Sequence, residues 1–510
     1  MAIKVGGTTV IDDSRALSNI ASVDATTVAA LGAAGIAGGG GTIDLVAAEN
    51  FTAGDLAVLD SSTGKAAKPT VTDAVGSDVS SLRLITQQSY DFDMIFDATS
   101  GRAIAAANFS NNNAYRAYYI TNTSDGSVNF NQGQIIGYNF AVQHTHMAYD
   151  PVEGTAVFFY RTNSDKYKTG QMNANGYLDF SEEQSLPFNL GNDPFMASTY
   201  DPDTGKIIVI WRDSTDSNKV KYVLGTASGN SVSWGTPGTV STLLADSNRP
   251  DAIAVTYDET ANRVLVCFVS ASYIRAVAGE VSGDTISWGT LVTDTTYLAF
   301  AVALTYVPSA GKNLLVYGSD SVEGTISIVF TLSGSTVSKG AVTTFGNKYA
   351  YYNDVVYNPD TTGLLVATSD DNNSGRVIPG EISGTTFSVT NGDWVFESGR
   401  SQNNKITYNS SLSKLYVVHT DANDNDYPYI ETAGAAASDV ANFIGVAAET
   451  VSTDATGKFT VLGGLNEEVT GLTTDTRYFA SVGGSLTAAD TGVSVGRAIA
   501  ADKILVTGGA

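Results

Sequence analysis

The chain has 510 residues and a net charge of −24 at pH 7, because 52 acidic residues outnumber 28 Lys and Arg residues. Phosphate backbones and anionic lipid surfaces repel such a chain, so neither nucleic acid nor membrane insertion is expected. One cysteine excludes a disulfide framework within the chain, and no apolar stretch reaches the roughly 18 residues of a membrane span. The 51 glycines and 43% apolar residues favour a turn-rich all-β protein that combines a large repeat domain with smaller parts.

Residues 1–47 are predicted to form an N-terminal attachment and oligomerisation segment. Residues 5–11 are expected to start as a hairpin, residues 24–34 to form a short Ala-rich helix, and residues 38–41 to act as a glycine hinge. A helix this short is marginal alone, so partner chains are expected to stabilise it. The segment lacks the apolar core of a secretory signal, so synthesis in a cytoplasm is expected.

Residues 48–80 and 436–510 are predicted to be the two parts of one small β-barrel module. Both contain short apolar runs separated by glycine turns, such as residues 51–60 and 442–449. The ends of an inserted domain lie close together, so residues 81–435 are expected to be inserted between the two parts.

Residues 81–435 repeat one pattern seven times: an apolar run that ends in an aromatic residue, a turn of Asx-Pro-x-x-Gly-Lys type, and a second apolar run. The repeated aromatic residues are Phe96, Tyr149, Tyr200, Tyr257, Tyr306, Tyr357 and Tyr408, about fifty residues apart. Each unit is a β-hairpin that cannot bury its own faces. The pattern is therefore typical of a seven-bladed β-propeller.

A second phrase, Ser-Gly-x-x-x-Ser-Trp-Gly-Thr, occurs at residues 228–236 and 282–290. We interpret it as a hairpin turn before the fourth strand, with its Trp packed between blades. The seventh unit ends one strand short at Thr432, whereas residues 81–86 have the pattern of an unpaired fourth strand. The N-terminal strand is therefore expected to complete the last blade and remove the exposed strand edges.

The two flanks carry a family resemblance. Residues 3–15, followed by residues 17–20, resemble the start of many tailed-bacteriophage structural proteins, especially tail fibres. The flanking module, with residues 53–55 and 443–447, resembles small β modules of phage tail and head-decoration proteins. The resemblance covers residues 1–80 and 436–510 and implies a virion component, a homotrimer that attaches to other virion proteins by its N-terminus. The propeller itself matches no named family.

The loops between the second and third strands of the units are rich in Asp and Asn and are expected to share one face of the disc with nearby aromatic residues. Asx side chains accept hydrogen bonds from sugar hydroxyls, and aromatic rings stack on the apolar face of a sugar. The alternative is that Asx-rich loops are simply good turns. The candidate receptor-binding residues are Tyr115, Arg161, Tyr167, Trp211, Asp213, Tyr273, Asp370, Asp371, Asp421 and Asp424.

No metal, cofactor or catalytic activity is expected. Residues 421–426 lack the glycine and the closing Glu of an EF-hand loop, and His144 with His146 is a pair without further ligands. No nucleophile, phosphate-loop or paired-cysteine motif occurs. The arginines do not fall at one blade position, as a sialidase-like site would require.

The sequence therefore predicts a phage tail fibre or spike in the virion, whose propeller recognises a host-surface glycan or outer-membrane protein. Three copies that bind together would allow each site to be weak. Two alternatives stay open: a capsid decoration protein with a structural role, and a depolymerase that cleaves the host polysaccharide.

Overall fold

The computed structural model is all-β among the residues that it describes, with one short 3-10 helix, η1 (Ala422–Asp424). The described residues are 3–5, 8–11, 41–60, 62–69, 71–84, 88–97, 100–109, 114–122, 128–130, 134–138, 146–161, 164–173, 177–190, 195–246, 252–346, 350–369, 374–390, 392–410, 412–438, 443–480, 485–488 and 493–507. They include the expected N-terminal hairpin of β1 (Ile3–Val5) and β2 (Thr8–Ile11). The expected helix at residues 24–34 and the glycine hinge at 38–40 lie outside them.

The chain separates into two compact units, residues 1–71 with 438–510, and residues 72–437. The first boundary differs from the expected one at residue 80, because β6 (Val71–Arg83) pairs with a strand of the second unit. The attachment segment also ends earlier than residue 47, since β3 (Thr42–Val46) belongs to the sheet of the flanking module.

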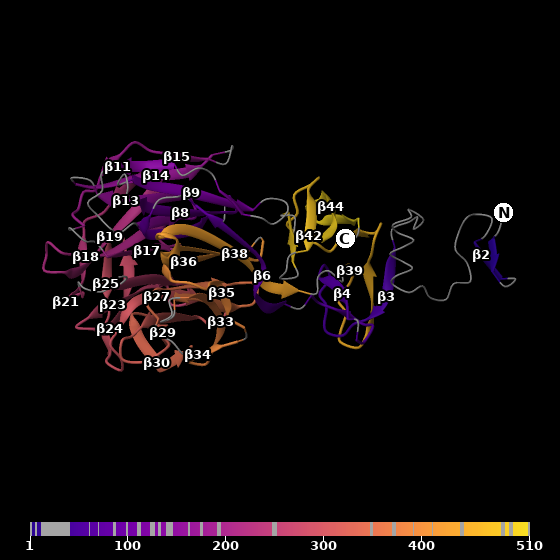
Figure 1. The fold of residues 1–510 in the computed structure, drawn as a ribbon. Helices are drawn as coiled ribbons and strands as arrows, with labels where there is room; N and C mark the ends of the chain where they lie inside the picture. The colour runs from indigo at the N-terminus through magenta and orange to yellow at the C-terminus, as the bar shows by residue number, and fades with distance from the viewer. Residues whose placement is uncertain are drawn as a thin grey trace. The chain divides into compact units, whose positions relative to one another are not determined.

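The described residues of the second unit form seven antiparallel sheets, which we number in chain order (Figure 1). Sheet 1 contains β7 (Ser89–Asp97), β8 (Arg102–Phe109), β9 (Ala114–Asn122), β10 (Val128–Phe130) and β11 (Gln134–Tyr138). Sheet 2 contains β12 (His146–Asp150), β13 (Thr155–Arg161), β14 (Asp165–Met172), β15 (Leu178–Phe180) and β16 (Gln184–Ser185). Sheet 3 contains β17 (Met196–Asp201), β18 (Lys206–Asp213), β19 (Lys219–Ser228), β20 (Ser231–Trp234) and β21 (Gly238–Leu244).

The later sheets repeat this order. Sheet 4 contains β22 (Ile253–Asp258), β23 (Arg263–Ser270), β24 (Tyr273–Ser282), β25 (Thr285–Trp288) and β26 (Val292–Asp294). Sheet 5 contains β27 (Phe300–Val307), β28 (Lys312–Gly318), β29 (Thr325–Ser333) and β30 (Thr336–Phe345). Sheet 6 contains β31 (Asn353–Asn358), β32 (Gly363–Ser369), β33 (Gly375–Ser383), β34 (Thr386–Val389) and β35 (Trp394–Glu397), and sheet 7 contains β36 (Ser401–Asn409), β37 (Lys414–Asp421), β38 (Tyr427–Ser438) and β6.

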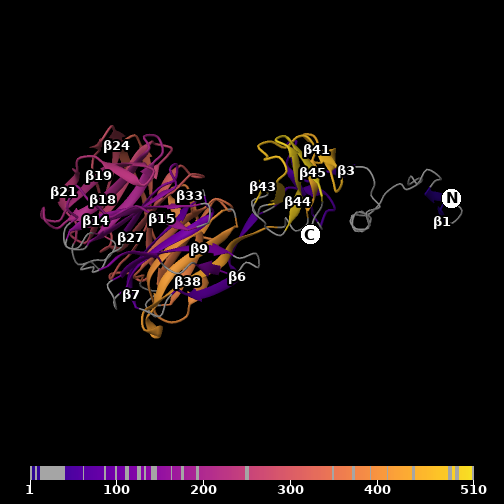
Figure 2. The same cartoon turned by 90° about the horizontal axis from the view of Figure 1, so that it is seen from above.

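The first strands of the seven sheets contact one another in a closed cycle. Each of β7, β12, β17, β22, β27 and β31 contacts the first strand of the following sheet, and β36 contacts β7 again. Both views show the strands of sheet 1 beside those of sheet 7 (Figures 1 and 2). A closed cycle of antiparallel sheets around shared inner strands is the arrangement of a β-propeller.

The N-terminal strand closes this cycle, as the sequence predicts, but β6 begins at Val71, ahead of the predicted start at residue 81. In Figure 1 the indigo β6 lies beside the orange β38, its partner in sheet 7. The Leu84 amide donates to the Pro428 carbonyl at 2.9 Å, and the Ser81 hydroxyl donates to Glu431 Oε1 at 2.5 Å. The pairing covers an edge of β38 that would otherwise be free to pair with another chain.

The repeated Tyr-Asx turns join neighbouring sheets. They form what we call the turn edge of each sheet, as at residues 150–155, 201–206 and 258–263. The hydroxyl of a repeated Tyr donates to an acidic side chain in or beside the turn of the preceding sheet. The bonded pairs are Tyr149 with Asp97, Tyr257 with Asp203, and Tyr408 with Asp360. The sequence repeat is therefore also a repeat of contacts between sheets.

The second repeated phrase meets the first at the turn edge. The Lys206 ammonium, just after the turn of sheet 3, donates to Asp284 in the hairpin of sheet 4 at 2.8 Å. Gly289 follows the Trp of that phrase, and a Cβ there would lie 2.1 Å from the carbonyl oxygen of Ser335 in the next hairpin. Glycine therefore allows the close approach of neighbouring sheets.

The cores lie between neighbouring sheets, because a second strand such as β23 is buried on both faces. Trp234 of sheet 3 packs on Phe159 and Tyr167 of sheet 2 and on Phe188, which follows β16, with ring centroids 5.6–5.8 Å apart. This confirms the expected place of the repeated Trp between blades.

The two flanks form one module from both ends of the chain, built of two five-stranded sheets. The described residues therefore form no single closed barrel. One sheet contains β3, β4 (Leu56–Leu59), β5 (Ala66–Ala67), β39 (Phe443–Ala447) and β40 (Thr456–Thr460). The other contains β41 (Leu465–Asn466), β42 (Arg477–Ala480), β43 (Leu486–Thr487), β44 (Ser494–Ala500) and β45 (Lys503–Val506).

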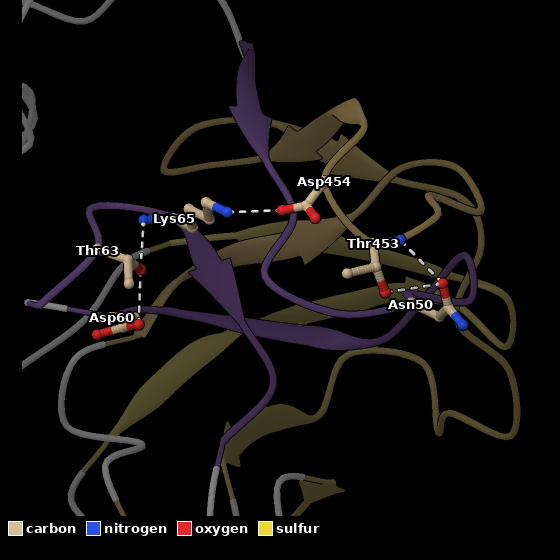
Figure 3. A network of polar contacts seen from close by, with 6 residues as sticks. All are labelled: Asn50, Asp60, Thr63, Lys65, Thr453 and Asp454. Carbon is tan, nitrogen blue, oxygen red and sulfur yellow. Dashed lines mark hydrogen bonds and ion pairs between the residues drawn. The ribbon is translucent and has the colours of Figure 1, made fainter.

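Polar contacts join the two flanks across the first of these sheets (Figure 3). The Lys65 ammonium donates to Asp454 Oδ1 at 2.6 Å. Asn50 Oδ1 accepts from the amide and the hydroxyl of Thr453 at 2.9 and 3.1 Å. Each pair joins a residue near the N-terminus to one near the C-terminus, so the module is complete only when both flanks are present.

Candidate binding face

The second-to-third-strand loops form the opposite end of each sheet, which we call the loop edge. Residues 213–219, 270–273 and 421–427 are examples. In an antiparallel sheet with strands in chain order these loops lie at the end away from the first-to-second-strand turns. The candidate residues from the sequence were expected here.

Three of the candidate aromatic residues are core residues, so their assignment to the binding face is wrong. Tyr115, Tyr167 and Trp211 are 1%, 3% and 1% exposed. Trp211 stacks on Phe188 with ring centroids 5.0 Å apart, and the Tyr167 hydroxyl donates to the Val232 carbonyl at 3.2 Å. Sheets in this fold pack face to face, so an aromatic ring near a loop in sequence is covered by the neighbouring sheet.

Two candidate carboxylates are held within their own turns. Asp213 Oδ1 accepts from the amide and the hydroxyl of Thr215 at 2.9 and 2.6 Å. Asp421 Oδ1 accepts from the Asn423 amide at 2.8 Å. These are Asx turns, which the sequence analysis kept as the alternative explanation for the loops.

The remaining candidates differ in position. Tyr273 is half-buried at the start of β24, and Arg161 lies at the end of β13, where its backbone is in register with that of Asp165. Asp370 and Asp371 lie outside the described residues.

Asp424 belongs to a half-exposed cluster of charged and aromatic side chains, which we call the closing-strand cluster: Arg83, Asp424, Tyr427 and Tyr429. Asp424 Oδ2 accepts from Arg83 Nη1 at 3.2 Å and from the Tyr429 hydroxyl at 2.7 Å. The hydrogen bond to Asp424 is the main reason that the pKa of Tyr429 rises to about 12.

The same cluster offers an aromatic surface. The Arg83 guanidinium lies over the Tyr427 ring, 5.5 Å from its centroid. Arg83 belongs to the closing strand β6, so the cluster forms only when the cycle of sheets is closed. A ring beside an ion pair can stack on a sugar and bond its hydroxyls.

The third strands of five sheets carry a cation at the same register position, which the sequence analysis missed. Each of these cations pairs with the residue that lies five places after the first residue of the second strand. These third-strand cations are Arg116, Lys166, Lys221, Arg275 and Arg376, opposite Ala107, Tyr160, Trp211, Phe268 and Thr368. Sheets 5 and 7 have Ile326 and Tyr429 there. Arginine alone does not repeat at one position, but arginine and lysine together do, and only the pairing register aligns them.

The inner strands carry a second set of ionisable residues, the axial residues Asp93, His146, Asp354 and Lys405. Each lies four positions before the corner Asp or Asn of its strand, in sheets 1, 2, 6 and 7. Sheets 3, 4 and 5 have Ala197, Ala254 and Ala303 at this position. The charged residues therefore lie on four consecutive sheets of the cycle.

The axial carboxylates bond to the next sheet. Asp93 Oδ2 accepts from the Met147 amide at 2.7 Å and lies 3.0 Å from His146 Nδ1. Asp354 Oδ2 accepts from the Ile406 amide at 2.9 Å. Each carboxylate thus satisfies an amide on an inner strand that has no further strand beside it.

The pKa values of the two axial carboxyls move in opposite directions. Burial raises the pKa of Asp354 to about 6, against the attraction of Lys405. Burial acts in the same direction on Asp93, but the His146 imidazole and Lys405 outweigh it and hold the pKa of Asp93 below its ordinary value. Of these two carboxyls, Asp354 is therefore the one whose charge changes nearer neutral pH.

Other reactive groups are few in the described part of the chain. No set of three or more His, Cys, Asp or Glu side chains there is placed to hold a metal ion. Cys267 is buried, and burial raises the pKa of its thiol. No described helix is long and apolar enough to cross a membrane. His144 of the predicted His pair lies outside the described residues.

No protein-family model matches the chain, and no curated protein sequence matches it. Among solved structures, the chain is similar to the BP39L lectin from Burkholderia pseudomallei, with 11% identity, a TM-score of 0.49, and coverage of 70% of this chain and 96% of the lectin. It is also similar to AofleA from Arthrobotrys oligospora, with 13% identity, a TM-score of 0.41, and coverage of 70% of this chain and 96% of AofleA. A third similar structure is the polysaccharide lyase Uly1, with 11% identity, a TM-score of 0.45, and coverage of 77% of this chain and 100% of the lyase. Similarities this distant assign no activity to the chain.

Proposed function

We propose that the chain is a carbohydrate-binding attachment protein of a phage virion, in which the loop edge of a seven-bladed propeller contacts a host-surface glycan. The observation that carries this proposal is the row of third-strand cations, which repeats one polar position in five of the seven sheets. Equivalent positions around a rigid ring suit a ligand that is itself a repeat. A polysaccharide meets this description, and several weak contacts on one polymer multiply.

The virion part of the proposal rests on the N-terminal and flanking sequences. Residues 3–15 and the split module resemble phage structural proteins. In this proposal the N-terminal segment docks to other virion proteins, and the chains assemble as a homotrimer that projects the propellers.

Cell binding by the purified full chain tests the proposal. Labelled protein should bind host cells and block infection, and labelled particles should carry the chain on the tail. Absence of host-cell binding, or a label confined to the head, would contradict it. A head label would favour the capsid-decoration alternative.

Two lysines of sheet 3 provide a matched pair of variants. Lys221 lies in the row of cations and contacts Asp216 Oδ2 at 2.6 Å, whereas Lys206 lies at the turn edge and contacts Asp284 Oδ1 at 2.8 Å. Lys221→Ala should weaken host-cell binding, and Lys206→Ala should leave it unchanged. Equal effects would show that the binding does not involve the loop edge.

The depolymerase alternative is tested by release of reducing sugar from host polysaccharide. The axial pair of Asp93 and His146 has the orientation of a general base, with Nδ1 toward the carboxylate. His146 Nε2 is, however, buried and lacks a hydrogen-bond partner, so a substrate would have to displace protein to reach it. The geometry therefore favours binding over cleavage.

A further inference from the structure

The loops that join the second and third strands of sheets 3 and 7 have the same length. Each begins at an Asp that ends the second strand, Asp213 or Asp421, and this Asp pairs in register with the residue six places later. In both loops the fourth and fifth residues after the Asp, 217–218 and 425–426, have positive φ. The two loops can therefore be compared residue by residue.

In sheet 3 the compared positions hold one carboxylate and two lysines. Asp216 lies three places after Asp213 and contacts the Lys219 ammonium at 2.8 Å and the Lys221 ammonium at 2.6 Å. Hydrogen bonds from these two lysines hold the pKa of Asp216 below its ordinary value. The carboxylate of this loop is thus paired with cations of its own third strand.

In sheet 7 the same positions hold Asp424, Tyr427 and Tyr429, so two tyrosines stand where sheet 3 has two lysines. The cation comes from the fourth strand instead, because Arg83 of β6 contacts Asp424 Oδ2 at 3.2 Å. The Arg83 and Asp424 side chains are 41% and 35% exposed, and both tyrosines are half-buried. The closing-strand cluster therefore presents aromatic and charged groups that solvent already reaches.

This cluster has unused hydrogen-bonding capacity of both kinds. Asp424 Oδ2 accepts from Arg83 and from the Tyr429 hydroxyl, whereas no described residue donates to Asp424 Oδ1. A guanidinium has five N–H groups, and the contact with Asp424 uses one of those on Arg83. A sugar hydroxyl both donates and accepts, so neighbouring hydroxyls of one ring can bond to Oδ1 and to the guanidinium without breaking the ion pair.

The charges of the cluster favour a neutral ligand. The carboxylate of Asp424 offsets the charge of Arg83, so the pair has no net charge to attract an anion. The net charge of −24 on the whole chain opposes the approach of an acidic polymer. A neutral hexose has an apolar face that packs on an aromatic ring and carries no charge that the chain repels.

We propose that the closing-strand cluster binds one neutral hexose ring of the glycan, which packs against Tyr427 and bonds through its hydroxyls to Asp424 and Arg83. This inference rests on the proposed glycan-binding function and names the class of sugar. Arg83 belongs to β6 and the other three residues to the segment 422–429 of sheet 7. The site is therefore complete only when the N-terminal strand has closed the ring.

Calorimetric titration of the full chain at 0.15 M salt tests the inference. The probes are dextran, mannan and galactan, which are neutral polymers of glucose, mannose and galactose, and the sulfated form of each. The wild-type chain should bind at least one neutral polymer and should bind its sulfated form at least tenfold more weakly. Failure to bind any of the three, or binding of the sulfated form as tight as that of the neutral one, would overturn the inference.

Variants of Tyr427 assign the binding to the cluster. Tyr427→Leu should weaken binding of the neutral polymer about tenfold, because it removes the ring. Tyr427→Phe should keep most of the affinity, because the ring remains. Asp424→Asn keeps the shape of its side chain and removes the charge, so it should also weaken binding and tests the site even if loss of the ring unfolds the loop.

Tyr177 provides the matched control at the turn edge. It is 48% exposed, and its ring lies 5.9 Å from that of Tyr119, over which the Arg102 guanidinium lies 5.8 Å from the centroid. Tyr177→Leu should change the affinity less than twofold. Equal losses in Tyr177→Leu and Tyr427→Leu would overturn the inference. A lower thermal midpoint with unchanged affinity in Tyr427→Leu would make Tyr427 a structural residue.

Host-cell binding separates this inference from the proposed function. If Lys221→Ala weakens host-cell binding and Tyr427→Leu does not, the proposed function stands and this inference fails. If Tyr427→Leu weakens binding of the neutral polymer but the wild-type chain binds no host cells, the cluster is a sugar site and the proposed function fails.

Discussion

The turn edge and the loop edge of the sheets differ in where their polar side chains find hydrogen-bond partners. At the turn edge, Tyr hydroxyls, corner carboxylates and Lys side chains bond mostly to one another across neighbouring sheets. At the loop edge, polar groups are mostly satisfied within single sheets, as at Asp213 and Arg376, or remain unmet, as at Arg275. The repeated turns therefore join the sheets to one another, and the loop edge carries the groups that the proposed glycan would contact.

The largest expected loss of stability is at a buried carboxylate of the turn edge. Asp258 is 1% exposed and accepts from the Ala261 amide at 2.8 Å and the Asn313 side-chain amide at 2.7 Å. Asp258→Ala should cost about 3 kcal/mol of unfolding free energy, since it leaves two buried donors unmet. Urea unfolding measures the loss. Asp284→Ala, which removes an exposed ion-pair partner of Lys206, should cost less than about 0.5 kcal/mol and serves as the control.

A smaller loss of stability is expected where sheet 7 donates hydrogen bonds to Asp360 of sheet 6. The Tyr408 hydroxyl and the Ser413 hydroxyl both donate to Asp360 Oδ2. Tyr408→Phe should destabilise by about 1.5 kcal/mol, because a hydrogen bond to a partly buried carboxylate is lost. Tyr351→Phe, at a ring that is 39% exposed, should leave the urea midpoint unchanged. Equal losses in both variants would remove the contrast between the two edges.

The axial residue Asp354 should make the stability of the protein depend on pH. The pKa of Asp354 rises from 3.8 to about 6 on folding, so between these values the folded chain binds this proton more tightly than the unfolded chain. This group therefore lowers stability as the pH rises through about 6. Asn cannot ionise, so the unfolding free energy of the Asp354→Asn variant, relative to that of the wild type, should rise by about 1 kcal/mol when the pH is raised from 5 to 8. Thermal midpoints at the two pH values measure this, and a difference that does not change with pH would refute the assignment.

The smallest effect on stability is expected in the closing-strand cluster. The side chains of Arg83 and Asp424 are 41% and 35% exposed, and such ion pairs contribute about 0–1 kcal/mol. Arg83→Ala should therefore change the unfolding free energy by less than about 0.5 kcal/mol while it weakens glycan binding several-fold. A large loss of stability with unchanged binding would place Arg83 among the residues that hold the ring.

The repeated Tyr-Asx turns predicted the sheets well because turn chemistry is local. Residues 200–206 contain the corner carboxylate, the glycine and the lysine that the structure uses. Closure by β6 was also predictable, since a missing strand at one end matched a spare strand at the other.

The binding face was harder to predict for a physical reason. Trp211 lies next to a polar loop in sequence, but a strand between two sheets has no solvent face, so nearness to a loop says nothing of exposure. Lys221 and Arg275 occupy one position only once the register is known, because the loops before them differ in length. The flanking module illustrates a related limit: its strands were expected, whereas their division into two sheets depends on pairing between distant segments.

Hydrogen exchange of the full chain with and without the bound glycan tests the division between the two edges most directly. We predict that the glycan protects loop-edge segments such as 213–222, 270–276 and 421–429, and leaves turn-edge segments such as 150–155, 201–206 and 258–263 unchanged. Protection confined to the turn edge, or to the flanking module, would contradict the account.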